Sequence, residues 1–376
     1  MTDYIPFEIQ SHIIKMLPII SIVQCRSVSK SWKFFIDSSE FITDYNVLHT
    51  QPQRILIGYV DSDEEKHISL VDDDDTFPWQ KHSLSVPATI KKLYEPRLVG
   101  CSQGLFCFFS YMEKPSDFET KTAVLWNPAI RKSIDIVVPN VLDWPYQTFV
   151  GFGVCPRTND PKLVKISNNR NPLEIDYSIP CIPWQVEVFT LSSGIWRSPL
   201  INVPRKAIVL SQSLEVIDGF IYWLAYKRIR NIDLTWCNLI MSFDVTSEEF
   251  NEVYLPNSLT YDRSIDLYSS TLKESLVVLE FDNGREVYGV WMMEHGVSKS
   301  FTKLYNINTP NAWIGNVIGF RNSGEPIVQM IYGFEERGAL VVYDPHSENV
   351  NYIGICGKGF TFFGSSYVET PLLLNQ

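Results

Sequence analysis

Residues 1–45 place their apolar side chains at the spacing of an α-helix. One face carries an isoleucine or leucine at every fourth position: Ile5, Ile9, Ile13 and Leu17. This period predicts an amphipathic helix. Pro6 is tolerated at the first helical position and Pro18 cannot continue the helix, so the helix has a start and a stop. A segment this short cannot hide the apolar face within itself, so the face needs a second surface to cover it.

Two more short helices are predicted before residue 46. Ser21 opens the sequence SIVQ, a capping box in which the serine oxygen accepts a backbone N–H and Gln24 reaches back to the cap. The second helix then places three residues along one side: Ile22, Cys25 and Val28. The third helix is centred on Trp32 and is predicted to run on to Phe41 and Tyr45.

Beyond residue 45 the pattern changes to short β-strands joined by turns. Most runs are rich in Val, Ile, Phe, Tyr and Trp, and they are either alternating or apolar throughout, as half-buried and fully buried strands are. A strand, a polar turn and a second strand recur with starts 62, 54, 50 and 51 residues apart, at Val124, Val186, Ile240, Val290 and Val341. This spacing fits one four-stranded propeller blade per repeat.

The predicted fold is therefore mainly β. Residues 1–45 are expected to form a small three-helix unit, and residues 46–376 a β-propeller. An earlier, degenerate repeat around LIGYVDSDEEKHISL brings the number of repeats to six, which predicts six blades. Because the repeats share shape more than letters, a mixed β-sandwich with irregular insertions stays open as the alternative.

The charge and the cysteines narrow the class of protein. The net charge is −11, nearly all of it beyond residue 50, which argues against non-specific nucleic-acid binding. The seven cysteines are odd in number and form no C-x-x-C pair, as expected for reduced, mostly buried thiols in the cytosol or nucleus. No apolar run reaches transmembrane length and no secretory leader is recognisable, so neither a nucleic acid nor a membrane is an expected partner.

No pattern of catalytic or metal-ligating residues is found. The six histidines lack H-x-x-x-H and H-E-x-x-H spacing, and no G-x-S-x-G elbow occurs. The acidic stretch from Asp61 to Asp75 begins like a calcium loop, but Lys66 and Asp72 stand where such a loop needs glycine and glutamate. The stretch is predicted to be a solvated, mobile surface loop, and no catalytic residue, metal or cofactor is expected.

One basic cluster interrupts the acidic body of the chain, in the sequence YKRIRN. Its members are Lys227, Arg228 and Arg230. Most such clusters are solvated loop charges with little energetic effect. Alternatively, these residues lie at the rim of a surface that binds a target protein, where they would speed its association.

The N-terminal segment resembles the plant F-box, whose pattern runs Leu-Pro, a helix, Leu-Pro, Ser-Leu, then Arg-x-Val-x-Lys-x-Trp and a closing Phe. The matching positions are Ile5, Pro6, Ile9, Leu17, Pro18, Ser21, Ile22, Arg26, Val28, Lys30, Trp32 and Phe41. Two positions depart from it, because Ile20 replaces the usual basic residue and Ser29 the frequent cysteine. Further on, LVGCSQGLFCFF and AVLWNPAIRK are similar to the F-box-associated region of plant F-box/kelch-like proteins, S-locus relatives included. Together the resemblance covers nearly the whole chain.

The resemblance implies a non-catalytic substrate receptor of an SCF-type cullin–RING ubiquitin ligase. In that family the F-box helices bind a Skp-type adaptor that leads to a cullin scaffold, and the propeller holds a target protein for ubiquitination and degradation. On this sequence the adaptor contact is assigned to Ile5, Pro6, Ile9, Ile13, Leu17, Pro18, Ile22, Cys25, Val28 and Trp32. Trp32 is equally suited to a structural role, holding the three helices together.

Three alternatives stay open. The helices can form an intramolecular cap on the propeller, since amphipathic helices often pack within their own chain. The propeller can be an enzyme with a helical extension, which would need convergent ionisable groups with perturbed pKa values at the mouth of its channel. The chain can also be an F-box scaffold that binds the adaptor without presenting a target.

Overall fold

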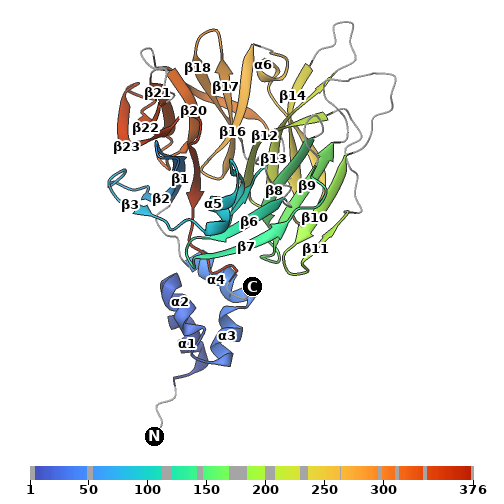
Figure 1. Ribbon diagram of the computed structural model, residues 1–376, viewed down its shortest axis with the longest axis vertical. Helices are drawn as coiled ribbons and strands as arrows, with labels where there is room; N and C mark the ends of the chain where they lie inside the picture. The colour runs from blue at the N-terminus through green and yellow to red at the C-terminus, as the bar shows by residue number, and fades with distance from the viewer. Residues whose placement is uncertain are drawn as a thin grey trace.

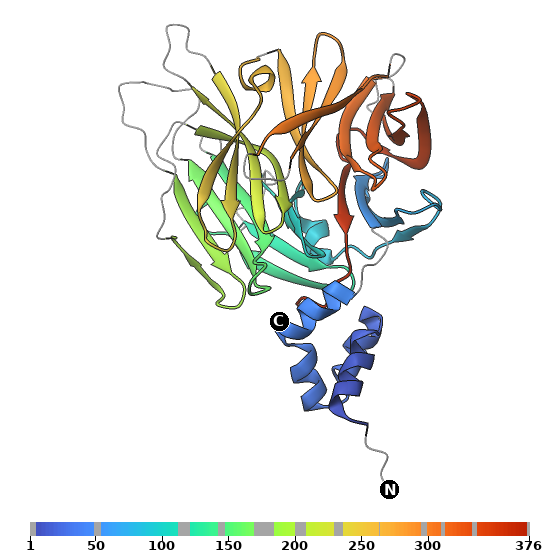
Figure 2. The same ribbon diagram turned by 180° about the vertical axis from the view of Figure 1, so that it is seen from behind.

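In the computed structural model, a small helical unit projects from one face of a ring of β-sheets (Figure 1). The structure describes residues 5–48, 54–111, 121–141, 147–168, 184–199, 208–228, 236–262, 264–294, 299–309, 313–332 and 337–373. Figure 2 shows from behind that the C-terminus returns to the same face, next to the last helix of the unit. The C-terminal segment therefore lies at the junction between the helical unit and the ring.

Four helices form the N-terminal unit: α1 (Phe7–Lys15), α2 (Ile19–Cys25), α3 (Lys30–Ile36) and α4 (Ser39–Leu48). The sequence predicted three, with the third running on to Tyr45. That helix instead ends at Ile36. The Ser38 hydroxyl donates to the Phe35 carbonyl at 2.7 Å and accepts the Phe41 N–H at 3.1 Å. A serine that bonds the backbone on both sides competes with helix continuation and starts a new helix.

The start of α2 also differs from the prediction. Ser21 lies inside the helix, and the cap is Pro18, whose carbonyl accepts the N–H groups of Ser21 at 2.9 Å and Ile22 at 3.1 Å. Pro18 has the extended ψ of 150° typical of an N-cap, so the helix begins directly behind it. A serine cap does occur at the start of α3, where the Ser29 hydroxyl accepts the Trp32 N–H at 3.1 Å.

The strands form six antiparallel sheets of four strands each. Blade 1 comprises β24 (Phe363–Tyr367), β1 (Arg54–Val60), β2 (Lys66–Asp72) and β3 (Lys81–Ser83). Blade 2 comprises β4 (Arg97–Ser102), β5 (Leu105–Phe109), β6 (Thr122–Asn127) and β7 (Lys132–Val137). Blade 3 comprises β8 (Gln147–Val154), β9 (Pro161–Asn168), β10 (Gln185–Thr190) and β11 (Ile195–Arg197).

The other three blades follow in chain order. Blade 4 comprises β12 (Ile208–Ile217), β13 (Phe220–Arg228), β14 (Trp236–Asp244) and β15 (Phe250–Tyr254). Blade 5 comprises β16 (Ile265–Leu272), β17 (Ser275–Asp282), β18 (Val287–Met293) and β19 (Phe301–Ile307). Blade 6 comprises β20 (Trp313–Phe320), β21 (Pro326–Tyr332), β22 (Arg337–Tyr343) and β23 (Val350–Lys358). The innermost strands of the six blades are β24, β4, β8, β12, β16 and β20.

Blade 1 closes the ring, because its innermost strand comes from the far end of the chain. Strand β24 pairs antiparallel with β1, in a register that runs from Arg54 opposite Tyr367 to Gly58 opposite Phe363. The backbone hydrogen bonds of this one sheet thus hold the first and last strands of the propeller together.

The six-bladed propeller predicted from the repeats is confirmed, and the β-sandwich alternative is wrong. The five repeat starts all fall in the third strand of a blade, namely β6, β10, β14, β18 and β22. The degenerate repeat is the β1–β2 hairpin. Beyond residue 48 the described ranges contain two helices, α5 (Ala88–Lys92) and α6 (Asn257–Thr260), of only five and four residues.

The hydrophobic core lies between neighbouring blades. Blades 3 and 4, for example, share a cluster that includes Val164, Trp223 and Phe243. Two backbone segments approach closely at Gly104, which has a φ of +75° and lies against Val368. A Cβ at this position would lie 2.1 Å from the carbonyl oxygen of Val368, so only glycine lets the C-terminal segment pass at this point.

The acidic stretch is only in part the solvated surface loop that the sequence predicted: residues 62–65 and 74–75 are exposed, but Lys66–Asp72 form strand β2. Asp72 is buried, and its carboxylate bonds Nε of Arg54 at 2.7 Å. The buried Asp73 carboxylate pairs with Nε of Arg321 at 2.9 Å and accepts the N–H of Asn322 at 2.7 Å. The second pair joins the β2–β3 loop of blade 1 to blade 6. Its partners are 248 residues apart, so local charge density could not reveal them.

Six of the seven cysteines lie in the described ranges, and all six are free thiols, of which Cys107, Cys155 and Cys237 are buried. Cys181 lies outside those ranges. Among the helices that the structure describes, none combines the length and the apolar character needed to cross a membrane.

Candidate functional site

The helical unit has its own apolar core. Its fully buried or nearly buried members are Ile14, Ile19, Ile22, Ile36, Phe41 and Tyr45. The Tyr45 hydroxyl donates to the carbonyl of Leu17 at 3.3 Å, and burial, with the nearby charge of Glu369, raises the pKa of Tyr45 to about 12. Ile22, one of the predicted adaptor contacts, has no exposed surface. It therefore supports the arrangement of the helices from inside, which corrects its assignment to a contact surface.

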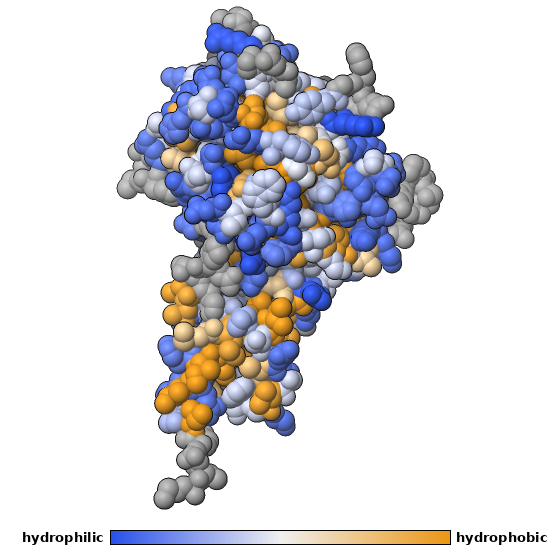
Figure 3. Space-filling view, turned by 90° about the vertical axis from the view of Figure 1, so that its left-hand side faces the viewer, coloured by the Kyte–Doolittle hydropathy of each residue, from blue (hydrophilic) through white to orange (hydrophobic). Residues whose placement is uncertain are grey.

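The opposite side of α1 remains apolar and uncovered. Ile9 is 52% exposed and Ile13 is 50% exposed, whereas their neighbour Ile14 is 1% exposed. The predicted contacts Ile5, Pro6, Pro18 and Val28 are exposed as well. Sequence reasoning left seven further exposed apolar residues of the unit out of the contact set: Phe7, Met16, Ile20, Val23, Phe34, Val47 and Leu48. Figure 3 shows the resulting hydrophobic surface along the helical unit.

Three other predicted contacts are partly buried against the core of the helical unit: Leu17, Cys25 and Trp32. The indole Nε1 of Trp32 donates to the side-chain oxygen of Gln10 at 3.0 Å, which ties α3 to α1. Trp32 thus holds the helices together, as its structural interpretation required, while part of its surface stays accessible.

Ion pairs fix the helices further. The Arg26 guanidinium binds the Asp37 carboxylate through Nε at 2.5 Å and a second nitrogen at 2.8 Å. The Lys15 ammonium pairs with Asp44 at 2.5 Å, so the end of α1 is held against α4. With its internal core and these cross-links, the unit presents its exposed apolar residues on a fixed surface.

The helical unit is attached to the propeller through α4 and not through α1. Ile42 packs in the same apolar cluster as Leu372 and Leu373 of the C-terminal segment. The Asn159 side chain of the β8–β9 turn donates to the Ser39 carbonyl at 3.3 Å and to the Thr43 hydroxyl at 3.1 Å. Since the α1 face remains half exposed, the interpretation of the helices as an intramolecular cap that hides this face is wrong.

Lys227, the one member of the basic cluster whose side chain the structure describes, lies near the end of β13. Gly219, just before β13, contacts Pro156 in the β8–β9 turn, and Asn159 of the same turn binds α4. Strand β13 therefore begins on the side of the helices and ends, at Arg228, on the side away from them. The Lys227 ammonium is held by Glu252 at 3.0 Å and lies over the Tyr254 ring at 5.2 Å. The side chain of Arg228 and the whole of Arg230 lie outside the described residues.

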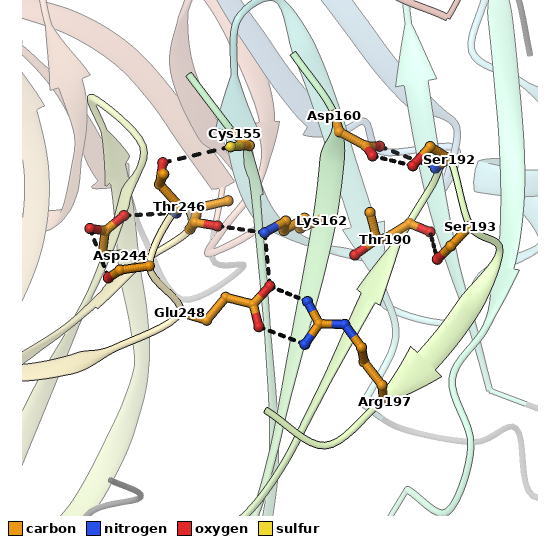
Figure 4. Close-up of polar contacts among 12 residues, drawn as sticks. Cys155, Asp160, Lys162, Thr190, Ser192, Ser193, Arg197, Asp244, Thr246 and Glu248 are labelled. Carbon is orange, nitrogen blue, oxygen red and sulfur yellow. Dashed lines mark hydrogen bonds and ion pairs between the residues drawn. The ribbon is translucent and has the colours of Figure 1, made fainter. Parts of the chain in front are cut away.

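An ion network joins blades 3 and 4, with Lys162 and Glu248 buried and Arg197 half exposed (Figure 4). The Lys162 ammonium binds the Glu248 carboxylate at 2.8 Å and the Val245 carbonyl at 2.8 Å, and the Arg197 guanidinium holds the same carboxylate with two nitrogens. Burial would raise the pKa of Glu248, but the hydrogen bonds and charges of Arg197 and Lys162 outweigh it, so the pKa lies below its usual value. With every charge paired, this network is a structural cross-link.

The described ranges contain no group of three or more histidine, cysteine, aspartate or glutamate side chains arranged to hold a metal ion. The described geometry is that of an interaction protein: a rigid helical unit with an outward apolar face is carried on one side of a six-bladed ring. This is the architecture of an F-box protein.

The helical unit and the propeller each match a known protein family. The F-box domain matches residues 3–44, and the F-box associated beta propeller domain matches residues 54–368. The chain belongs to the family of F-box proteins with this propeller. An F-box implies binding to a Skp-type adaptor, and its combination with the propeller supports a substrate-recognition role in an SCF ligase.

Curated relatives agree with this assignment. The F-box protein CPR1 of Arabidopsis thaliana is 23% identical over 340 residues, which cover 82% of this chain and 74% of that protein. The F-box protein At3g07870 of the same plant is 25% identical over 334 residues, covering 82% and 73%. Among solved structures, the periplasmic gluconolactonase PpgL of Pseudomonas aeruginosa is 11% identical and covers 84% of this chain and 99% of its own, with a TM-score of 0.40.

Proposed function

We propose that this protein is the non-catalytic substrate receptor of an SCF-type cullin–RING ubiquitin ligase. Its helices bind a Skp-type adaptor, and its propeller holds a target protein for ubiquitination and degradation. The observation that carries the proposal is the uncovered apolar face of α1, with Ile9 and Ile13 half exposed on a helix whose other side is packed. A contiguous apolar surface on a rigid unit is typical of a protein–protein interface.

The surface proposed for the adaptor consists of the exposed members of the predicted set, which are Ile5, Pro6, Ile9, Ile13, Pro18 and Val28. Leu17, Cys25 and Trp32 contribute the part of their surface that the helical core leaves accessible. We add Phe7, Met16 and Ile20 on the ground of their exposure in the same unit.

The mechanism is proximity. The helices attach the receptor to the ligase, and the ring holds the target where partner enzymes deliver activated ubiquitin. Tethering converts an encounter between separate molecules into one at high effective concentration, so no side chain of this protein needs to take part in bond making. Attachment through α4 supports this mechanism, because it fixes how the ring is oriented relative to the helices.

The adaptor contact is tested with the double variant Ile9→Asp/Ile13→Asp. An unpaired charge in an apolar interface costs several kcal/mol, about 3 or more, so pull-down of the Skp-type adaptor should be lost. Both side chains are half exposed, so thermal unfolding should change little. The matched control is Leu304→Asp, on the outer strand β19, which is 38% exposed and should leave adaptor binding intact. Normal adaptor binding by a folded double variant would refute the proposal.

The target surface is proposed at the face opposite the helices, where β13 ends. Lys227 is already paired with Glu252, so Arg228 and Arg230 are the members of the cluster to reverse. The double variant Arg228→Glu/Arg230→Glu should slow association with a target that co-purifies, most strongly at low salt, while adaptor binding persists. An unchanged association rate at low salt would leave these residues as solvated loop charges.

Two other functions compete with this one. A propeller enzyme would need converging acid–base groups, whereas the described lining of the central channel contains a single carboxyl and no lysine, arginine or histidine. A scaffold without a target would bind the adaptor yet leave no co-purifying protein ubiquitinated, and an assay of such proteins with the cullin active or inhibited separates it from a receptor. We place the protein in the cytosol or nucleus, which the free thiols of the described residues support.

A further inference from the structure

The innermost strands of the propeller enclose a cavity of about 250 Å³ on the ring axis. Five of these strands supply the described lining: β4, β12, β16, β20 and β24. The cavity therefore belongs to the closed ring as a whole and not to one blade. Its described lining includes neither a residue of the helical unit nor Lys227.

The wall of this cavity is rich in hydrogen-bond acceptors. Hydroxyl and amide side chains come from Gln212, Ser213, Ser269, Ser270, Thr271, Asn316, Ser365 and Ser366. The innermost strand of each blade pairs with a neighbour on one side only, so its other edge turns backbone carbonyl and N–H groups towards the axis. Ser213 and Ser269 bond each other through their hydroxyls at 2.7 Å, which joins β12 to β16 and keeps this part of the wall fixed.

One charged side chain lines the cavity among the described residues, and it is acidic. Glu215 on β12 faces a lining in which the structure describes no lysine, arginine or histidine. Within the described part of the chain, no hydrogen bond or ion pair joins its carboxyl group to another residue. The buried carboxylates of Asp72, Asp73 and Glu248, by contrast, each have a cationic partner inside the protein. An ionised Glu215 would therefore need a cation from outside the described protein as its partner.

We propose that the central channel binds a small primary ammonium ligand, with Glu215 as its counter-ion. An ammonium group donates three hydrogen bonds and accepts none, which matches a wall of one carboxylate and several neutral oxygen acceptors. A divalent metal ion fits less well, because the described residues offer no group of three ionisable ligands. The site is independent of adaptor binding, since it involves no residue of the helical unit.

The protonation of Glu215 gives this site a pH signature. Burial raises the pKa of the Glu215 carboxyl to about 8, so at pH 7 the empty site holds mostly the neutral acid. The neighbouring ionisable groups stay neutral over this range. Burial raises the pKa of the Cys101 thiol on β4 and of the cross-strand Tyr222 on β13 each to about 12, and it also raises the pKa of Tyr268 on β16. Binding an ammonium ion should therefore release one proton, from Glu215.

The experiment is calorimetric titration of the full chain with ethanolammonium chloride, with ethylene glycol as neutral probe and sodium acetate as anionic probe. Saturable binding is expected for ethanolammonium alone. Its affinity should rise about tenfold from pH 6 to pH 7, because the ionised fraction of a group with a pKa near 8 rises tenfold over that interval. Buffers of different ionisation enthalpy should report release of close to one proton per ligand at pH 7.

Variants assign the binding to the channel. Glu215→Gln should weaken ethanolammonium binding at least tenfold and remove its pH dependence, whereas Glu215→Asp, which keeps the charge, should retain both. The matched control is Glu274→Gln in the exposed β16–β17 turn, which should bind as the wild type does. No saturable binding to the wild type, unchanged binding by Glu215→Gln, or equal binding of ethylene glycol or acetate would each overturn the proposal. Adaptor pull-down should be the same for all variants, so this result and that of the proposed function are separate.

Discussion

The side-chain amide of Asn127 donates hydrogen bonds to the backbone carbonyl of Leu372 at 2.8 Å and to that of Thr370 at 2.9 Å. Asn127 ends β6 in blade 2, and Leu372 lies at the end of the chain, 245 residues away. Leu372 in turn packs in the cluster that contains Ile42 of α4. Asn127 thus holds the C-terminal segment in the position where it supports the helical unit.

Asn127→Ala should destabilise the protein by about 3 kcal/mol. The substitution leaves two buried carbonyls without donors, and it also removes the acceptor that bonds the Ala129 N–H at 2.9 Å. Urea unfolding measures the loss. Asn283→Ala, which removes an exposed hydrogen bond to Asp266, is the control and should change the free energy of unfolding by less than about 0.5 kcal/mol. Equal stability of the two variants would show that the C-terminal segment is not held by Asn127.

Two adjacent isoleucines of α1 should behave in opposite ways. Ile14→Ala should reduce the stability of the helical unit by about 3 kcal/mol, because Ile14 is buried in its core. Ile13→Ala should leave that stability within about 0.5 kcal/mol, because Ile13 is half exposed, yet it should weaken adaptor binding. Hydrogen exchange of the helical amides and adaptor titration measure the two effects. Similar stability losses in both variants would mean that the outward face is covered.

Closure of the ring should depend on the ion pair between Asp73 and Arg321. Asp73→Ala removes one of the two carboxylates that bind the Arg321 guanidinium, the other being Glu325 at 2.8 Å, and it leaves the Asn322 N–H without its acceptor. A loss of about 2 kcal/mol is therefore expected by urea unfolding. The matched control is Glu64→Ala. That side chain is 81% exposed and pairs with Lys358 at 3.7 Å, so its removal should cost less than about 1 kcal/mol. If Asp73→Ala proves as mild as the control, the backbone pairing of β24 with β1 closes the ring unaided.

The Glu248 network should make stability depend on pH in acid. The pKa of Glu248 is lowered in the folded protein, so its stabilisation is fully present above the ordinary glutamate value of about 4.3 and is lost as the pH falls through the folded-state pKa. Glu248→Gln should therefore be less stable than the wild type at pH 7, with a difference that shrinks as the pH falls below about 4.3. Thermal unfolding from pH 3 to pH 7 measures this difference. A difference independent of pH would assign the effect to packing.

Much of the candidate site was predictable because its pattern is local. The spacing of Ile9, Ile13 and Leu17 marks α1 as amphipathic, since side chains three or four residues apart share a helix face. The number of helices was predicted less well. The break between α3 and α4 depends on the hydroxyl of Ser38, whose competition with helix continuation has no periodic signal.

The sequence by itself determined the F-box pattern, the six repeats and the separation of a helical unit from a β-rich body, because periods of four, two and about fifty residues are properties of the chain. Tertiary structure decided which apolar face stays open. Ile13 and Ile14 are equally apolar in sequence, but only Ile14 meets the core formed with Ile36 and Phe41. Tertiary structure also decided which carboxylates have a cationic partner, because ring closure brings distant residues together. Asp73 gains Arg321, whereas Glu215, on the channel axis, gains no partner in the described chain.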